Sequence, residues 1–145
     1  MNPEQLLRRL GACGEALDWV RGRAEARAWQ QCPRGDWLFW LAARSGLDPD
    51  RLRGCAIRCV GLAVSLRVDL TPTARRDLCG IKNRDLWVRA YHAGGLVFEL
   101  GAAADDISPK LCRLLLKGAA NIVREELSLV ELRQLCDHVV ASEDV

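Results

Sequence analysis

The sequence lacks long hydrophobic runs, a leader-like N-terminus and a phosphate-binding loop. Its longest purely apolar stretch, residues 37–43, is much shorter than the roughly 20 residues that a membrane-spanning helix needs. Residues 1–5 contain no basic region followed by an apolar block, so no secretory signal is visible and we expect a cytoplasmic protein without a membrane partner. The glycines within residues 11–14 fall in a helical pattern and lack the lysine of a phosphate loop.

Residues suited to catalysis or metal binding are few and scattered. The seven cysteines are odd in number and contain no Cys-x-x-Cys pair, unlike a disulfide scaffold or a structural zinc site. Cys55 and Cys59 could share an ion with Cys136 and His138, but they lie where a helix needs apolar atoms. A cysteine could also pair with His92 or His138 as its base, yet no local signature marks a nucleophile. We therefore predict reduced core thiols and no catalytic, cofactor-binding or metal-binding residues.

Helix signals are abundant, whereas sustained strand alternation and hairpin turns are absent. A capping side chain precedes proline at four places, and Ser128 with Glu131 has the spacing of a capping box. The four pairs are Asn2-Pro3, Asp48-Pro49, Thr71-Pro72 and Ser108-Pro109. Apolar residues recur at helical spacing from residue 6 to 20, and again in a helix over residues 84–103 that Gly94 and Gly95 interrupt. We predict an all-α fold, a compact orthogonal or antiparallel array of six to seven helices, forming one domain over residues 1–145.

Charge is unevenly distributed along the chain. Residues 51–89 carry nine basic and three acidic side chains, a net charge of +6, whereas residues 99–145 carry five basic and nine acidic ones, a net charge of −4. Such polarity can steer a partner, although solvated helix faces produce the same pattern. The candidate partner-binding residues are the charged side chains Arg51, Arg58, Arg75, Arg76, Arg84, Asp105 and Asp106.

Tryptophan is concentrated near the start of the chain. Trp19, Trp29, Trp37 and Trp40 all lie within the first 40 residues, and the segment that contains the last two is apolar on every side of a helix. A helix of this kind is expected inside a core, so we assign all four tryptophans to the core. Asp36 is placed to cap the start of that helix or to pair with an arginine from a neighbouring helix. The alternative is an exposed aromatic patch that binds a partner.

The tryptophan segment also carries a resemblance. Cys13, Ala16 and Trp19 form a Cys-x-x-Ala-x-x-Trp opening, and residues 32–41 read Cys-x-Arg-x-Asp-Trp-x-x-Trp-Leu. Residues 136–139 read Cys-Asp-x-Val. This pattern resembles the Imm5-like immunity proteins, a group of small all-helical bacterial and phage proteins. The resemblance implies a protein that neutralises a toxin or another effector protein by stoichiometric binding.

Three functions follow as hypotheses. The first is a non-catalytic inhibitor that binds a partner protein directly. The second is a phage or mobile-element protein that inhibits a host nucleic-acid-processing defence complex, as an anti-CRISPR protein does. The third is an arginine-rich module that binds nucleic acid, since arginine outnumbers lysine by eighteen to three.

Overall fold

The computed structural model describes residues 1–69, residue 72 and residues 90–143. Every regular element in these residues is a helix, so the all-α prediction is confirmed. The helices are α1 (Pro3–Leu10), α2 (Gly14–Val20), α3 (Glu25–Gln31), α4 (Gly35–Arg44), α5 (Pro49–Ser65), α7 (Ala90–Ile107), α8 (Pro109–Glu126) and α9 (Leu129–Glu143). The described residues thus hold eight helices, more than the six to seven predicted.

The extra helix at the N-terminus arises from Gly11. The sequence pattern predicted a single helix up to Val20, but Gly11 adopts φ +88° and ends α1 there. The N–H of Ala12 donates to the carbonyl of Leu7 at 3.0 Å, which closes the last turn of α1 in the left-handed capping arrangement. The chain then changes direction and α2 begins at Gly14. Apolar spacing alone did not reveal this break.

The opposite correction applies to Gly94 and Gly95, which were expected to interrupt a helix. Helix α7 runs through both glycines and continues to Ile107. A Cβ on Gly94 would lie 3.1 Å from the carbonyl oxygen of Asp36 and 3.1 Å from the Cβ of Trp40. Gly94 therefore allows α7 to cross α4 closely. The part of the predicted helix before Ala90 lies outside the described residues.

Most of the predicted helix starts are confirmed. The Asn2 side chain accepts from the N–H of Gln5 at 2.8 Å in a complete capping box, and the Ser108 hydroxyl accepts from the N–H of Leu111 at 3.1 Å. Asp48 precedes α5 without a capping hydrogen bond from its side chain. Ser128 accepts from the N–H of Glu131 at 3.1 Å, but the Glu131 carboxylate pairs with α5 instead of closing the box. Thr71 lies outside the described residues.

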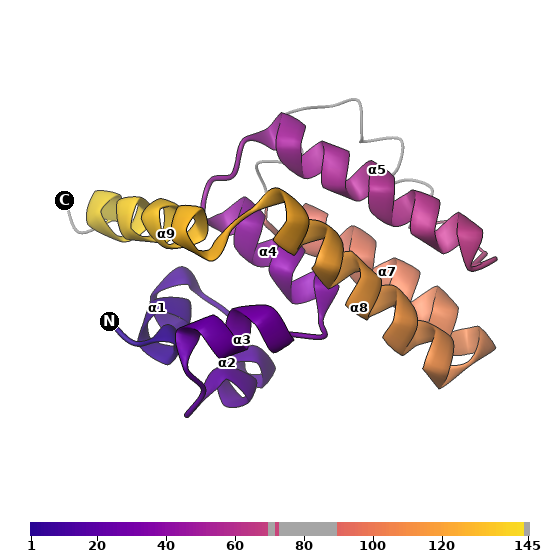
Figure 1. Ribbon diagram of the computed structural model, residues 1–145, viewed down its shortest axis with the longest axis horizontal. Coiled ribbons are helices and arrows are strands. Elements are labelled where there is room, and N and C mark those ends of the chain that lie inside the picture. Colours follow the sequence, from indigo (N-terminus) through magenta and orange to yellow (C-terminus); the bar gives the residue numbers. More distant parts are fainter. Residues whose placement is uncertain (70–71, 73–89, 144–145) are drawn as a thin grey trace.

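Helix α4 occupies the centre of the molecule, where it contacts α5, α7 and α8 (Figure 1). Its inner face buries Phe39 and Ala42 against Leu96 and Leu100 of α7 and Leu115 of α8, all five fully buried. Helices α1–α3 form a separate group that lies beside α9, close to the two chain ends (Figure 1). The outer face of α4 is thereby left to face the space beside the N-terminal helices.

Candidate functional site

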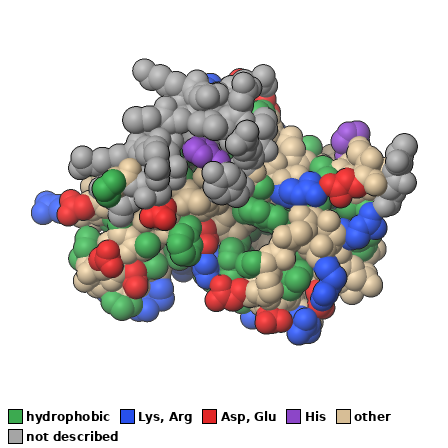
Figure 2. All heavy atoms as spheres, turned by 180° about the vertical axis from the view of Figure 1, so that it is seen from behind, with side chains coloured by type: hydrophobic (Ala, Val, Ile, Leu, Met, Phe, Trp, Pro, Cys, Tyr) green, Lys and Arg blue, Asp and Glu red, His purple; other side chains and the backbone are tan. Residues whose placement is uncertain are grey.

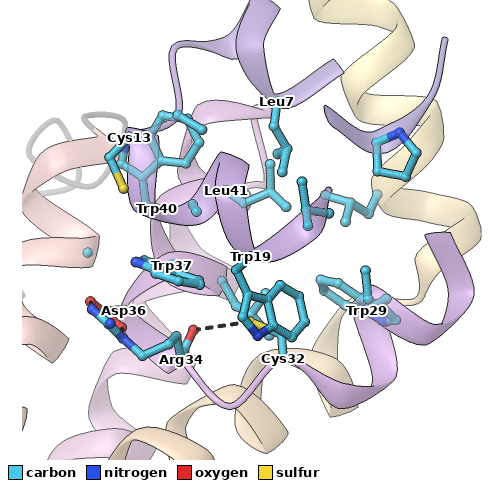
Figure 3. A pocket seen from close by; sticks show the side chains of 18 of the residues that line it. Leu7, Cys13, Trp19, Trp29, Cys32, Arg34, Asp36, Trp37, Trp40 and Leu41 are labelled. Atoms are coloured by element: carbon cyan, nitrogen blue, oxygen red, sulfur yellow. Dashed lines mark hydrogen bonds and ion pairs between the residues drawn. The ribbon is translucent and has the colours of Figure 1, made fainter. Parts of the chain in front are cut away.

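A pocket of about 970 Å³ lies between the N-terminal helices and the outer face of α4. Its lining is mainly apolar and comes from α1–α4, α7 and α9, together with the intervening loops. All four tryptophans of the N-terminal segment, Trp19, Trp29, Trp37 and Trp40, contribute to it. We refer to this space as the tryptophan pocket. Figure 3 shows the four indoles around this space, together with Leu7 and Leu41, which also line it.

The four tryptophans differ in exposure. Trp29 is buried, with 8% of its surface exposed, while Trp19, Trp37 and Trp40 pack against the core and remain partly exposed. The rings of Trp19 and Trp37 meet edge to face, with centroids 6.2 Å apart and planes inclined by 62°. Aromatic rings favour this geometry, which fixes both indoles as a rigid wall. Helix α4 is thus apolar on both sides because one side forms the core and the other forms the pocket.

A bidentate ion pair holds the base of this wall in place. Arg34 donates to the two carboxylate oxygens of Asp36 at 2.9 and 2.7 Å, and its guanidinium carbon lies 4.5 Å from the ring centroid of Trp37. Asp36 is buried, with 6% of its surface exposed. Asp36 does pair with an arginine, but the partner is Arg34, two positions earlier, and not an arginine from a neighbouring helix as predicted. The pair and the cation–π contact together orient the Trp37 indole.

Polar contacts from α8 and α9 attach the N-terminal helices to the rest of the molecule. Arg124 donates to the carbonyls of Trp29 and Cys32 at 3.1 and 2.8 Å, where α3 ends. Arg133 donates to Glu25 of α3 at 3.2 Å and to the carbonyl of Met1 at 3.2 Å. These bonds are long-range, and no residue pattern in the sequence indicated them.

Acidic side chains dominate the charged part of the pocket lining. The described lining residues include four acids, Glu15, Glu25, Asp36 and Glu99, but only two arginines, Arg34 and Arg133. Arg34 is bound to Asp36, and Arg133 pairs with Glu25 and with Asp137. Phe98, next to Glu99, has 56% of its surface exposed at the lip of the pocket. Phe98 was not among the predicted site residues, although an aromatic residue off the buried stripe of a helix is a signal for an exposed site.

The buried thiols have properties that suit packing. Burial raises the pKa of Cys55 to about 11, of Cys59 to about 12 and of Cys136 to about 11. Burial therefore disfavours the thiolate, which is the nucleophilic form of cysteine, at all three positions. Within the described part of the chain, no group of three or more potential ligand residues comes together to hold a metal ion. In the same residues, no helix has the length and apolar character needed to cross a membrane.

The structure describes four of the seven predicted partner-binding residues, and two of these four are engaged within the chain. Arg51 binds the carboxylates of Glu126 and Glu131, and Arg58 lies 2.5 Å from a carboxylate oxygen of Glu125. Both arginines therefore join α5 to α8 or α9. Asp105 and Asp106 are exposed near the end of α7. Arg75, Arg76 and Arg84 lie outside the described residues. On the face of the molecule that Figure 2 shows, the basic side chains are dispersed among acidic and hydrophobic ones.

The chain was compared with known protein families, curated proteins and solved structures, and none of them matches it.

Proposed function

We propose that the protein is a non-catalytic binding protein that neutralises a partner protein by seating a segment of it in the tryptophan pocket. The observation that carries the proposal is the partial exposure of Trp19, Trp37 and Trp40 in one apolar pocket. Tryptophan is enriched among the residues that contribute most to protein interfaces, because it buries a large, rigid surface at little entropic cost. The resemblance to the Imm5-like immunity proteins supports the same mode of action, since its motif residues Trp37 and Trp40 line the pocket.

The pocket favours a protein partner over nucleic acid. Both lining arginines are engaged in ion pairs, and acids outnumber them, so a phosphate backbone would be repelled. The second hypothesis, inhibition of a host defence complex, is compatible with this proposal if a protein component of that complex occupies the pocket. The predicted charged residues are then secondary for binding. Arg51 and Arg58, the two predicted arginines that the structure describes, already bind carboxylates of this chain.

Site-specific photo-cross-linking tests the proposal. A photoreactive amino acid replaces Cys13, which is exposed and lines the pocket, and a control places it at Ile57, which is exposed on α5 outside the pocket. We expect position 13, and not position 57, to capture one protein in cells that produce the chain. That protein, once purified, should bind the wild type with one-to-one stoichiometry and bind the Trp37→Ala variant weakly. Capture without dependence on Trp37, or turnover of the captured molecule, would contradict the proposal.

A further inference from the structure

The exposed residues of α7 beside the tryptophan pocket indicate what kind of partner segment would bind there. Helix α7 presents Phe98, Ala102 and Asp105 at positions i, i+4 and i+7, and Glu99 and Asp106 flank this row. Of these residues, Phe98, Ala102, Asp105 and Asp106 are exposed. One helix face thus leads from the apolar pocket lip to a pair of acids. We refer to Glu99, Asp105 and Asp106 as the α7 acidic row.

The acids of this row carry charge that the described part of the molecule does not neutralise. None of Glu99, Asp105 and Asp106 forms an ion pair with a described residue, whereas the lining acids Glu25 and Asp36 each do. Glu15 of α2, another lining acid, is 4.0 Å from Arg34 and its side chain is 77% exposed. The pocket lining therefore combines apolar side chains with the acids Glu15 and Glu99, and Asp105 and Asp106 continue the acidic charge along α7 beyond the lining. The complement of this surface is an apolar segment that carries basic side chains.

The length of this α7 face fits a chain segment. Phe98 and Asp106 are eight residues apart, which corresponds to about 12 Å along a helix. A ligand that contacts both must extend about two helical turns beyond the pocket lip. All the surrounding elements are helices, so the described residues offer no strand edge for pairing with an extended peptide. A groove between helices is typically filled by an amphipathic helix, whose apolar residues are spaced at i, i+3, i+4 and i+7.

On this basis, which depends on the proposed function, we infer that the partner segment is a basic amphipathic helix. Its apolar face fills the tryptophan pocket beside Trp37 and Phe98. Its lysine or arginine side chains lie against the α7 acidic row and Glu15. Association should therefore weaken as the salt concentration rises, because these ion pairs are exposed to solvent.

Selection from a peptide library tests the inference. The library consists of helical peptides with fixed apolar residues at i, i+3, i+4 and i+7 and with all other positions randomised. It is selected on the wild type and counter-selected on Phe98→Ala, a change at an exposed site that leaves the core intact, and on Trp37→Ala. We expect the selected peptides to be enriched in lysine and arginine. Pocket-dependent peptides without this enrichment, or no pocket-dependent peptides at all, overturn the inference. The proposed function fails separately, if the cross-linked partner binds independently of Trp37.

A matched pair of variants then locates the charge effect. Neutralising the α7 acidic row (Glu99→Gln, Asp105→Asn, Asp106→Asn) should weaken a selected basic peptide about ten-fold, as expected for the loss of several exposed ion pairs. A control removes the same charge at exposed acids that lie neither on α7 nor in the pocket lining (Asp50→Asn, Asp69→Asn, Glu143→Gln) and should change the affinity less than about two-fold. Equal effects of the two triple variants, or displacement of the peptide by a single-stranded or duplex oligonucleotide, would overturn the inference.

Discussion

Arg34 covers one face of the Trp37 indole, with its guanidinium carbon 4.5 Å from the ring centroid. The same guanidinium forms a bidentate pair with buried Asp36, so one side chain links the start of α4 to the wall of the tryptophan pocket. The core and the pocket are thus joined at the first turn of α4.

Removing this link should destabilise the fold. Arg34→Leu leaves the Asp36 carboxylate buried without its partner, at an expected cost of about 2 kcal/mol in the free energy of unfolding. The measurement is urea denaturation followed by circular dichroism. The double variant Arg34→Leu/Asp36→Leu should recover part of the loss, because no unpaired charge remains. A double variant that is less stable than Arg34→Leu would contradict this account of the pair.

Gly35 should tolerate no side chain. A Cβ at this position would lie 2.7 Å from the carbonyl oxygen of Leu116 and 2.8 Å from the N of Ala120, so α4 and α8 would have to separate. We expect Gly35→Ala to cost about 2 kcal/mol or more, as overpacked cores do. Gly54→Ala is the matched control, since Gly54 lies in α5 with open space around it and alanine favours the helix by about 0.5–1 kcal/mol. Thermal denaturation measures the change in stability of each variant, which should be a loss for Gly35→Ala and a gain for Gly54→Ala.

Arg51 should contribute to stability, because it ties α5 to the turn between α8 and α9. It donates to the Glu126 carboxylate at 2.7 Å, to the Glu126 carbonyl at 2.7 Å and to the Glu131 carboxylate. Arg51→Ala should lower the free energy of unfolding by roughly 1–2 kcal/mol, and Arg51→Lys should restore only part of it, since lysine lacks the planar fork. Amide hydrogen exchange at Glu131 should accelerate in both variants. Full recovery by lysine would show that charge alone acts here.

Alkaline pH should destabilise the protein through the buried thiols of α5. Burial raises the pKa of Cys59 from its ordinary value of 9.0 to about 12 and that of Cys55 to about 11. The folded state therefore disfavours the thiolate. The resulting stability is complete below pH 9 and is lost as the pH rises from 9 to about 12.

Thermal denaturation from pH 8 to pH 11 measures this effect. The melting temperature of the wild type should fall above pH 9, and the fall should be smaller in Cys55→Ala/Cys59→Ala. Cys13→Ser serves as the control, because Cys13 is exposed, and it should behave as the wild type does. An identical fall in all three proteins would assign the alkaline loss to other groups.

Sequence patterns predicted the helical class and the helix starts at Asn2, Ser108 and Ser128, because caps and apolar spacing are local properties. They did not predict the break at Gly11, since a glycine in a helical pattern can either end a helix or continue it. Gly94 shows the other outcome, and only the approach of α4 distinguishes the two. Local signals therefore predicted that these segments are helices more accurately than they predicted where each helix ends.

The candidate site was less accessible from the sequence. The apolar segment of residues 37–43 predicts a helix that other helices surround. It does not show that one side of α4 faces a pocket and not the core. The separation depends on where Arg124 and Arg133 attach the N-terminal helices, and these contacts span about 90 residues or more of the chain. The charges of Arg51 and Arg58 suggested a surface, yet their acidic partners lie 67 to 80 residues away in the sequence.

The most direct test of the central claim is isothermal titration of the cross-linked partner, once purified, against the wild type, Trp37→Ala and Arg58→Glu. We predict one-to-one binding to the wild type, a loss of at least about 2 kcal/mol of binding free energy in Trp37→Ala, as for an interface hot spot, and nearly unchanged binding in Arg58→Glu. Circular dichroism confirms that each variant is folded. Unchanged affinity in a folded Trp37→Ala variant, with binding lost in Arg58→Glu, would place the interface on the charged face of α5 and contradict the account.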